Sequence, residues 1–308
     1  MSTARRLRLG TRASPLARWQ ADWVAGELRR LGHEVALVPL STQGDQERAA
    51  PLGAIGGQGV FTKELERALL RNEIDLAVHS LKDLPTETVE GLELGAVPPR
   101  APTADVLVSR KWRSFVELPE GAVIGTGSLR RRAQLWHARR DLRMLDIRGN
   151  VDTRLRKLAD GEYDALVLAQ AGLRRLGLEA EITEVLREEL MLPAVGQGAL
   201  GIEIRSNDAD LKAVLSALDD ATTRAAITAE RSLLAALRGG CLAPVGAKGD
   251  VIAGQLRLRG VVLSGDGSVR LAAEQTGLSF EAHALGRQVA HDLLAQGAAE
   301  LIAASRAS

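Results

Sequence analysis

The chain has 308 residues, enough for two or three domains, with 45% hydrophobic and 26% charged residues, which is typical of a globular protein. A formal net charge of +1 argues against a nucleic-acid binder, which usually carries a basic surplus. The single cysteine, Cys241, excludes an intrachain disulfide and argues against a cysteine-built metal site, and the absence of a leader-like or membrane-spanning apolar segment leads us to expect a cytoplasmic protein.

The first hundred residues alternate between strand-like and helix-like stretches. Ser14 and Pro15 are typical of a helix start, and Gly32 is typical of its end. Thr62 begins a second helix, whereas the glycine-rich stretch 44–59 has no periodicity and predicts a loop. Strands are expected at residues 6–10, 33–40 and 74–78.

A proline-rich segment containing Pro98, Pro99 and Pro102 then indicates a break, after which the alternation resumes. Residues 193–201 indicate a second crossing between domains. The alternation predicts parallel strands joined by crossover helices. Strands are expected at 123–126, 142–147, 163–169 and 200–204, and helices at 128–140 and 151–160.

The character of the chain changes near Asp220. A helix is expected at 222–237, and strands at 251–262 and 269–275 flank the turn-forming sequence 264–267. With a last helix at 282–296, this segment indicates a small α+β domain. The expected domains are residues 1–98 with 199–217, residues 103–193, and residues 220–308.

Cations recur after the predicted strands, where parallel sheets bind ligands. Guanidinium groups and free N–H groups at helix starts both favour anions. Abundant arginine could also reflect solvated helix faces. Because no GxxxxGK[ST] phosphate loop is present, a substrate with several carboxylates is favoured over a nucleotide. The cations are Arg12, Lys82, Arg130, Arg131, Arg148, Arg154, Arg174 and Arg175.

Three other residues could take part in chemistry. Asp83 is a carboxylate among cations and could stabilise a developing positive charge, although it could equally cap a turn or pair with Lys82. Cys241 follows two glycines and could be a nucleophile or covalent anchor, although inert buried cysteines are more common. His79 could shuttle protons or be purely structural, and no histidine forms a hydrolase signature with Cys241.

Taken together, these motifs resemble the hydroxymethylbilane synthase family, also called porphobilinogen deaminase. The resemblance covers nearly the whole chain, in the order of the family. It implies an α/β fold of two periplasmic-binding-protein-like lobes with a hinged cleft, plus a small α+β C-terminal domain. The matching stretches are 11–17, 61–65, 77–83, 125–131, 148–150 with 153–154, 171–177, 193–199 and 239–241.

The resemblance also implies a dipyrromethane cofactor attached to Cys241 through a thioether. Four porphobilinogen molecules would be added to it in turn, with loss of ammonia, and linear hydroxymethylbilane released. Asp83 would be the catalytic residue and would also contact the cofactor. Further cofactor contacts would come from Ser80, Lys82, Thr126, Ser128, Arg130 and Arg131, and substrate contacts from Arg12, Arg148, Arg154, Arg175 and Gln197.

Two positions depart from the family pattern. Gln58 stands where the family has lysine, and Gly127 stands where it has serine, so one loop cation and one hydroxyl are missing. A monomer without metal, membrane or nucleic-acid partners is expected. The alternative from another class is a non-catalytic two-lobed protein that binds a small anion, which would leave Asp83 and the Gly-Gly-Cys sequence unexplained.

Overall fold

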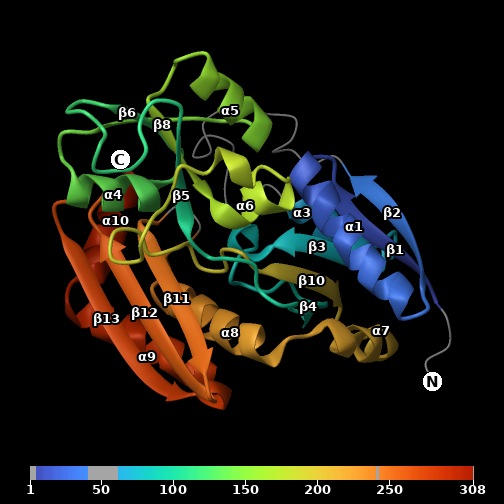
Figure 1. Cartoon of the computed structure of the whole chain (residues 1–308). Helices are drawn as coiled ribbons and strands as arrows, with labels where there is room; N and C mark the ends of the chain where they lie inside the picture. The colour runs from blue at the N-terminus through green and yellow to red at the C-terminus, as the bar shows by residue number, and fades with distance from the viewer. Residues whose placement is uncertain (1–4, 41–61, 241–242, 308) are drawn as a thin grey trace. The chain divides into compact units, whose positions relative to one another are not determined.

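The computed structural model describes residues 5–40, 62–240 and 243–307. The chain divides into two compact units, residues 1–100 with 199–224 and residues 101–198 with 225–308. Three sheets are present among the described residues, two of five strands and one of three. Figure 1 labels their elements. We call the two five-stranded sheets with their helices the first and second lobes, and the remainder from α8 (Ala221–Ala236) onward the C-terminal domain.

The sheet of the first lobe has the order β2-β1-β3-β10-β4. Strand β1 runs parallel to β2 and β3, whereas β10 is antiparallel to both of its neighbours. The prediction of all-parallel strands is therefore wrong here, because β10 returns from a distant part of the sequence. The strands are β1 (Arg6–Arg12), β2 (Glu34–Leu40), β3 (Leu76–Ser80), β4 (Leu92–Ala96) and β10 (Leu200–Arg205).

Helices cover both faces of this sheet. Helix α1 (Pro15–Arg30) begins as predicted, because the side chain of Ser14 accepts a hydrogen bond from the N–H of Ala17. The apolar face of α1 joins the core formed by β1, β3, β10 and α7, and α3 packs on the other face with Ile74 and Leu92. The remaining helices are α3 (Lys63–Leu70), the 3-10 turn η1 (Leu81–Asp83), α7 (Ala209–Leu215) and η3 (Ser216–Leu218).

The second lobe repeats this arrangement with the order β7-β6-β8-β5-β9. Strand β6 is parallel to β7 and β8, and β5 is antiparallel to β8 and β9, so the all-parallel prediction also fails in this sheet. In each lobe the antiparallel inner strand follows a chain crossing. The strands are β5 (Asp105–Ser109), β6 (Val123–Gly125), β7 (Arg143–Leu145), β8 (Ala165–Ala169) and β9 (Glu184–Val185).

Side-chain alternation along β8 divides the core of the second lobe. Ala165 and Val167 face the core that includes Leu135 of α4, whereas Leu166 and Leu168 face the opposite core with α5 and α6. The sheet is thus buried on both faces. The helices are α4 (Leu129–Ala138), α5 (Val151–Ala159), α6 (Gln170–Arg175) and the 3-10 turn η2 (Glu179–Glu181).

The C-terminal domain contains a three-stranded antiparallel sheet, and α9 packs against β12 and β13 (Figure 1). The hairpin at 264–267 is confirmed, but the expected strand 251–262 is wrong. It is divided by a turn at Ala253 and Gly254, both of which have positive φ. The elements are α8 (Ala221–Ala236), β11 (Val245–Ile252), β12 (Gln255–Leu263), β13 (Arg270–Leu278), η4 (Ser279–Glu281), α9 (Ala282–Ala295) and α10 (Ala298–Ala307).

Among the described residues, no helix is both long and apolar enough to cross a bilayer. The three expected domain boundaries stay a prediction, because the division into two units does not test them.

Candidate functional site

Strands β1 and β6, which hold corresponding positions in the two lobes, carry a similar Gly-Thr pair near their carboxyl ends. A Cβ added at Gly10 would lie 2.4 Å from Cδ1 of Ile74, and one added at Gly125 would lie 2.6 Å from Cδ2 of Leu166. Each glycine is followed by a buried threonine, Thr11 or Thr126, and shortly afterwards by a serine that caps the next helix. These two turns set the starts of α1 and α4.

In the first lobe, strand β3 leads directly into the predicted catalytic sequence. Asp83 ends the 3-10 turn η1 and is exposed. Within the described residues the Asp83 carboxylate has no hydrogen-bond or ion-pair partner. Lys82, the preceding residue, is half-buried. With respect to the part of the chain that the structure describes, this exposed carboxylate is available to a ligand.

Ser80 is held by a residue that the sequence analysis missed. The side-chain amide of buried Gln20, on α1, donates a hydrogen bond to Oγ of Ser80 at 2.7 Å. Because this bond occupies a lone pair of the hydroxyl, the Ser80 proton remains available for another acceptor. The spacing of Gln20 six residues after Ser14, on the inner face of a predicted helix, was the available signal.

His79 lies on β3, and Arg12 lies on the neighbouring strand β1. His79 is buried, and its Nε2 lies 3.1 Å from Oε2 of buried Glu203 on β10, so the structural interpretation of this histidine is favoured over a proton shuttle. Arg12 is the last residue of β1 and is half-buried. Arg12 is therefore at the carboxyl end of its strand, as predicted.

In the second lobe, the start of α4 is closely defined. The Ser128 hydroxyl accepts a hydrogen bond from the N–H of Arg131, and Thr126 Oγ1 accepts one from the N–H of Ser128. A Cβ at Gly127 would lie 3.2 Å from the main-chain oxygen of Ile147, so glycine fits the close approach of this backbone. The predicted residues Thr126 and Ser128 thus organise one helix N-terminus.

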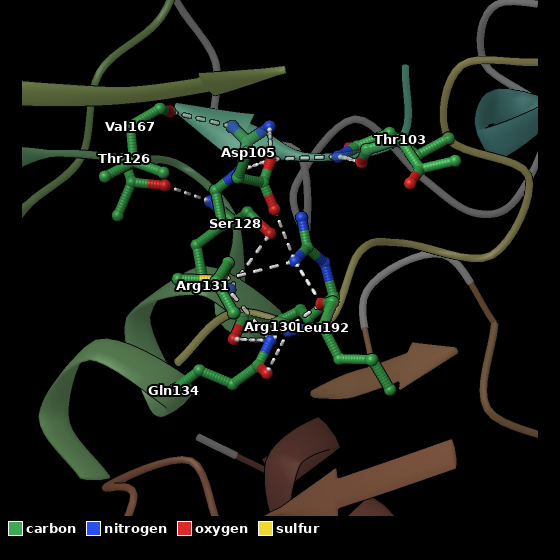
Figure 2. Close-up of polar contacts among 11 residues, drawn as sticks. Thr103, Asp105, Thr126, Ser128, Arg130, Arg131, Gln134, Val167 and Leu192 are labelled. Carbon is green, nitrogen blue, oxygen red and sulfur yellow. Dashed lines mark hydrogen bonds and ion pairs between the residues drawn. The ribbon is translucent and has the colours of Figure 1, made fainter. Parts of the chain in front are cut away.

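Arg130 and Arg131 are buried and share one carboxylate that the sequence analysis did not single out. Asp105 Oδ1 lies 2.7 Å from Nη2 of Arg131, and Asp105 Oδ2 lies 2.7 Å from Nη1 of Arg130, as Figure 2 shows. Asp105 is fully buried; although burial opposes its ionisation, the two guanidinium groups and a hydrogen bond from Gln197 lower its pKa to about 2. A lone aspartate opening the apolar run Val-Leu-Val was its only signal in the sequence.

Gln197 and Arg175 form hydrogen bonds that fix the second crossing, residues 193–201. The Gln197 side-chain amide donates to Asp105 Oδ1 at 3.0 Å and to the main-chain oxygen of Thr103 at 2.7 Å. Arg175 donates to the main-chain oxygen of Gly198 at 2.7 Å, and burial lowers its pKa to about 10. Both predicted substrate contacts are therefore engaged with the chain itself.

Arg148 and Arg154 lie around the turn between β7 and α5. Exposed Asp146 lies between Arg148, at 3.4 Å, and Arg132, at 3.1 Å. Arg154 donates from Nε to the main-chain oxygen of Gly149 at 2.9 Å. Arg148 and Arg154 are both half-buried, so this turn presents cations beside an exposed carboxylate.

The predicted anchor, Cys241, and the departure at Gln58 lie outside the described residues. The backbone that leads to the cysteine is described. Arg238 has a φ of 51° and Gly240 a φ of 63°, and a Cβ at Gly239 would lie 2.7 Å from Cδ1 of Leu234. The two glycines therefore permit a tight turn after α8. No metal-binding group of His, Cys, Asp or Glu occurs in the described part of the chain.

Comparison of the sequence with models of known families identifies the family of this chain. The family model described as "Porphobilinogen deaminase, dipyromethane cofactor binding domain" matches residues 7–213, and "Porphobilinogen deaminase, C-terminal domain" matches residues 224–295. The chain belongs to the porphobilinogen deaminase family.

Curated relatives agree with the family match. A protein named porphobilinogen deaminase from Desulforudis audaxviator is 52% identical, covering 97% of each chain. Those from Pelotomaculum thermopropionicum and Geobacter metallireducens are 49% and 48% identical, covering 98% and 97% of this chain and 97% and 94% of their own. The family resemblance read from the motifs is thus confirmed.

Solved structures with a similar arrangement include the methionine-binding protein MetQ, with a TM-score of 0.46 and 14% identity, covering 69% of this chain and 89% of that one. A putative methionine-binding lipoprotein from Bacillus subtilis has a TM-score of 0.44 and 15% identity, covering 70% and 90%.

Proposed function

We propose that this member of the porphobilinogen deaminase family is a hydroxymethylbilane synthase. It joins four porphobilinogen molecules head to tail, releases four molecules of ammonia, and uses one water to release linear hydroxymethylbilane. The observation that carries this proposal is the match of both family domains along nearly the whole chain. The reaction makes the protein a transferase of tetrapyrrole synthesis.

The residues of the second lobe suit a dipyrromethane cofactor. Such a group carries acetate and propionate arms, and the second lobe offers half-buried Arg148 and Arg154 together with the capped start of α4. When bound, the cofactor supplies the pyrrole carbon to which substrate rings are joined. Cys241, through a thioether, would hold it, with Ser80, Lys82, Asp83, Thr126, Ser128, Arg130 and Arg131 as contacts.

Asp83 is proposed as the catalytic residue. Loss of ammonia from porphobilinogen leaves a positive charge on the substrate pyrrole, which an ionised carboxylate stabilises. The same carboxylate accepts a hydrogen bond from the pyrrole N–H and so orients the ring. Its exposure and lack of a partner among the described residues leave it available for both tasks.

The cations are proposed to bind the acidic arms of successive rings. Arg12 ends β1, and Arg148 and Arg154 lie around the β7–α5 turn. The buried residues Arg175 and Gln197 are engaged with the main chain of the crossing, which supports a role in shaping that segment around substrate.

The test is the mass of the denatured, purified protein together with its consumption of porphobilinogen. Wild type should weigh more than its sequence by two linked pyrrole units and should release ammonia and hydroxymethylbilane. Cys241→Ser should lose both the added mass and turnover. Active wild-type protein with the mass of the bare chain would contradict covalent attachment, and folded wild type that does not consume porphobilinogen would contradict the function.

We further propose that the protein acts as a cytoplasmic monomer without a metal or nucleic-acid partner. The balanced charge and the lack of a metal-binding group among the described residues support this. Light scattering of the active protein and metal analysis by mass spectrometry are the corresponding measurements.

A further inference from the structure

Asp105 is the centre of a fully buried polar cluster in the second lobe. Its Oδ1 accepts hydrogen bonds from Nε and Nη2 of Arg131, at 3.0 and 2.7 Å, and from Nε2 of Gln197 at 3.0 Å. Its Oδ2 lies 2.7 Å from Nη1 of Arg130. One carboxylate therefore engages three side chains, as the close-up in Figure 2 shows for the two arginines.

Each of these three partners also binds the main chain of a different segment. Arg130 donates to the oxygen of Leu192 at 2.7 Å, and Arg131 donates to the oxygen of Val167 at 2.9 Å. Gln197 donates to the oxygen of Thr103 at 2.7 Å. The position of the Asp105 carboxylate therefore determines how the start of α4 lies against β8 and the two crossing segments of this unit.

The cluster also has an excess of positive charge. Within the described residues, every ion pair of Arg130 and Arg131 is with Asp105. Two guanidinium groups and one ionised carboxylate leave a net charge of +1. Because an uncompensated buried charge is unfavourable, an anionic group brought to the start of α4 would be stabilised.

We propose that Asp105 is a positioning residue for cofactor assembly: it holds the start of α4 so that one positive charge remains for an acidic arm of the dipyrromethane. Without the carboxylate, two buried guanidinium groups would repel each other and separate, and Ser128 and Arg131 would move with them. The inference rests on the proposed function, and it assigns a role to a residue outside the expected set of contacts.

The experiment compares Asp105→Asn with Asp75→Asn as a matched control. Asp75 is also a single carboxylate between two arginines, 2.8 Å from Arg8 and 3.3 Å from Arg205, but it lies at the amino end of β3 in the other unit. Apoprotein would be produced in cells that cannot make porphobilinogen. The rate at which each apoprotein gains the mass of two pyrrole units on adding porphobilinogen is then measured by intact-protein mass spectrometry.

We expect assembly in Asp105→Asn to be about 10- to 100-fold slower than in wild type, because small displacements of binding groups have effects of this size. Asp75→Asn should assemble at nearly the wild-type rate. Measurements are made at a temperature where circular dichroism shows each variant fully folded, so loss of stability alone does not change the rate. Equal rates for the two variants would overturn the proposal.

A second variant covers the case in which Asp105→Asn does not fold. Gln197→Met removes one hydrogen bond to Asp105 while keeping all three charges, and it should slow assembly by a smaller factor, about 3-fold or more, typical of one lost hydrogen bond. Assembly at the wild-type rate in this folded variant would also overturn the proposal. Wild-type apoprotein that gains no mass would instead contradict the proposed function.

Discussion

The two lobes share a strand order and a glycine–threonine pair at the carboxyl end of a parallel strand, β1 or β6, but they use their carboxylates in opposite ways. In the first lobe, Asp83 is exposed and has no partner among the described residues. In the second, Asp105 is completely buried and bound by two arginines and a glutamine. A common scaffold thus exposes one carboxylate and buries the other between two arginines.

The largest expected effect tests the exposed carboxylate. Asp83→Asn keeps the shape of the side chain but removes its charge, so turnover should fall about 10²- to 10³-fold, the effect of removing one electrostatic group from an active site. Glu87→Gln, an exposed carboxylate four residues later, is the matched control. The melting temperature should be unchanged in both. If Asp83→Asn turned over substrate at nearly the control rate, the exposed carboxylate would have no catalytic role.

The buried carboxylate should contribute to stability with a defined pH dependence. Because the pKa of Asp105 is lowered to about 2 in the folded protein, its contribution is present above the unfolded value of 3.8 and is lost as the pH falls towards 2. The shift corresponds to about 2 kcal/mol. The difference in unfolding free energy between wild type and Asp105→Asn should therefore shrink below pH 4. A difference independent of pH would contradict this.

The two corresponding strand glycines should respond alike to an added methyl group. Gly10→Ala and Gly125→Ala would place a Cβ 2.4 Å from Ile74 and 2.6 Å from Leu166. Each should lower the unfolding free energy by about 1–3 kcal/mol, as overpacking of a core does. Gly26→Ala, where a Cβ would meet nothing within 4 Å, is the control. Denaturant unfolding measures the unfolding free energy of all three variants. If only one of Gly10→Ala and Gly125→Ala lowered it, the two positions would not be equivalent.

The smallest expected effect concerns Glu66, a buried carboxyl group of the first lobe. Its pKa is shifted upward, whereas the pKa of Asp105 is shifted downward. Burial raises the pKa of Glu66, so the group contributes most at low pH and its contribution is lost as the pH rises through the folded value. Glu66→Gln should therefore raise the melting temperature at pH 8 by about 1–2 °C. The gain should disappear near pH 4. A loss of stability at pH 8 would show that the ionised form is favoured.

Local signals in the sequence predicted most elements because they are encoded within a few residues. Ser14, Pro15 and Gly32 define α1, and Ser128 defines the start of α4. The positions of the cations after strands were predictable for the same reason. These features require no knowledge of which strands pair.

Non-local pairing was not predictable from periodicity. The antiparallel placement of β10 and β5 depends on segments far apart in sequence. For the same reason, the sequence did not reveal that Arg130 and Arg131 converge on Asp105, or that Gln20 reaches Ser80. The split of the expected strand 251–262 at Ala253 and Gly254 was missed because Ala253 is not a residue typical of left-handed turns.

The position of β10 has a consequence for the order in which the protein can fold during synthesis. Among the described strands, β4 is paired only with β10, which is translated about a hundred residues later, whereas the last strand of the second lobe ends at Val185. The second lobe can therefore complete its sheet on the ribosome first. Until residue 205 emerges, the nascent first lobe carries unpaired edges on β3 and β4, and unpaired strand edges favour aggregation.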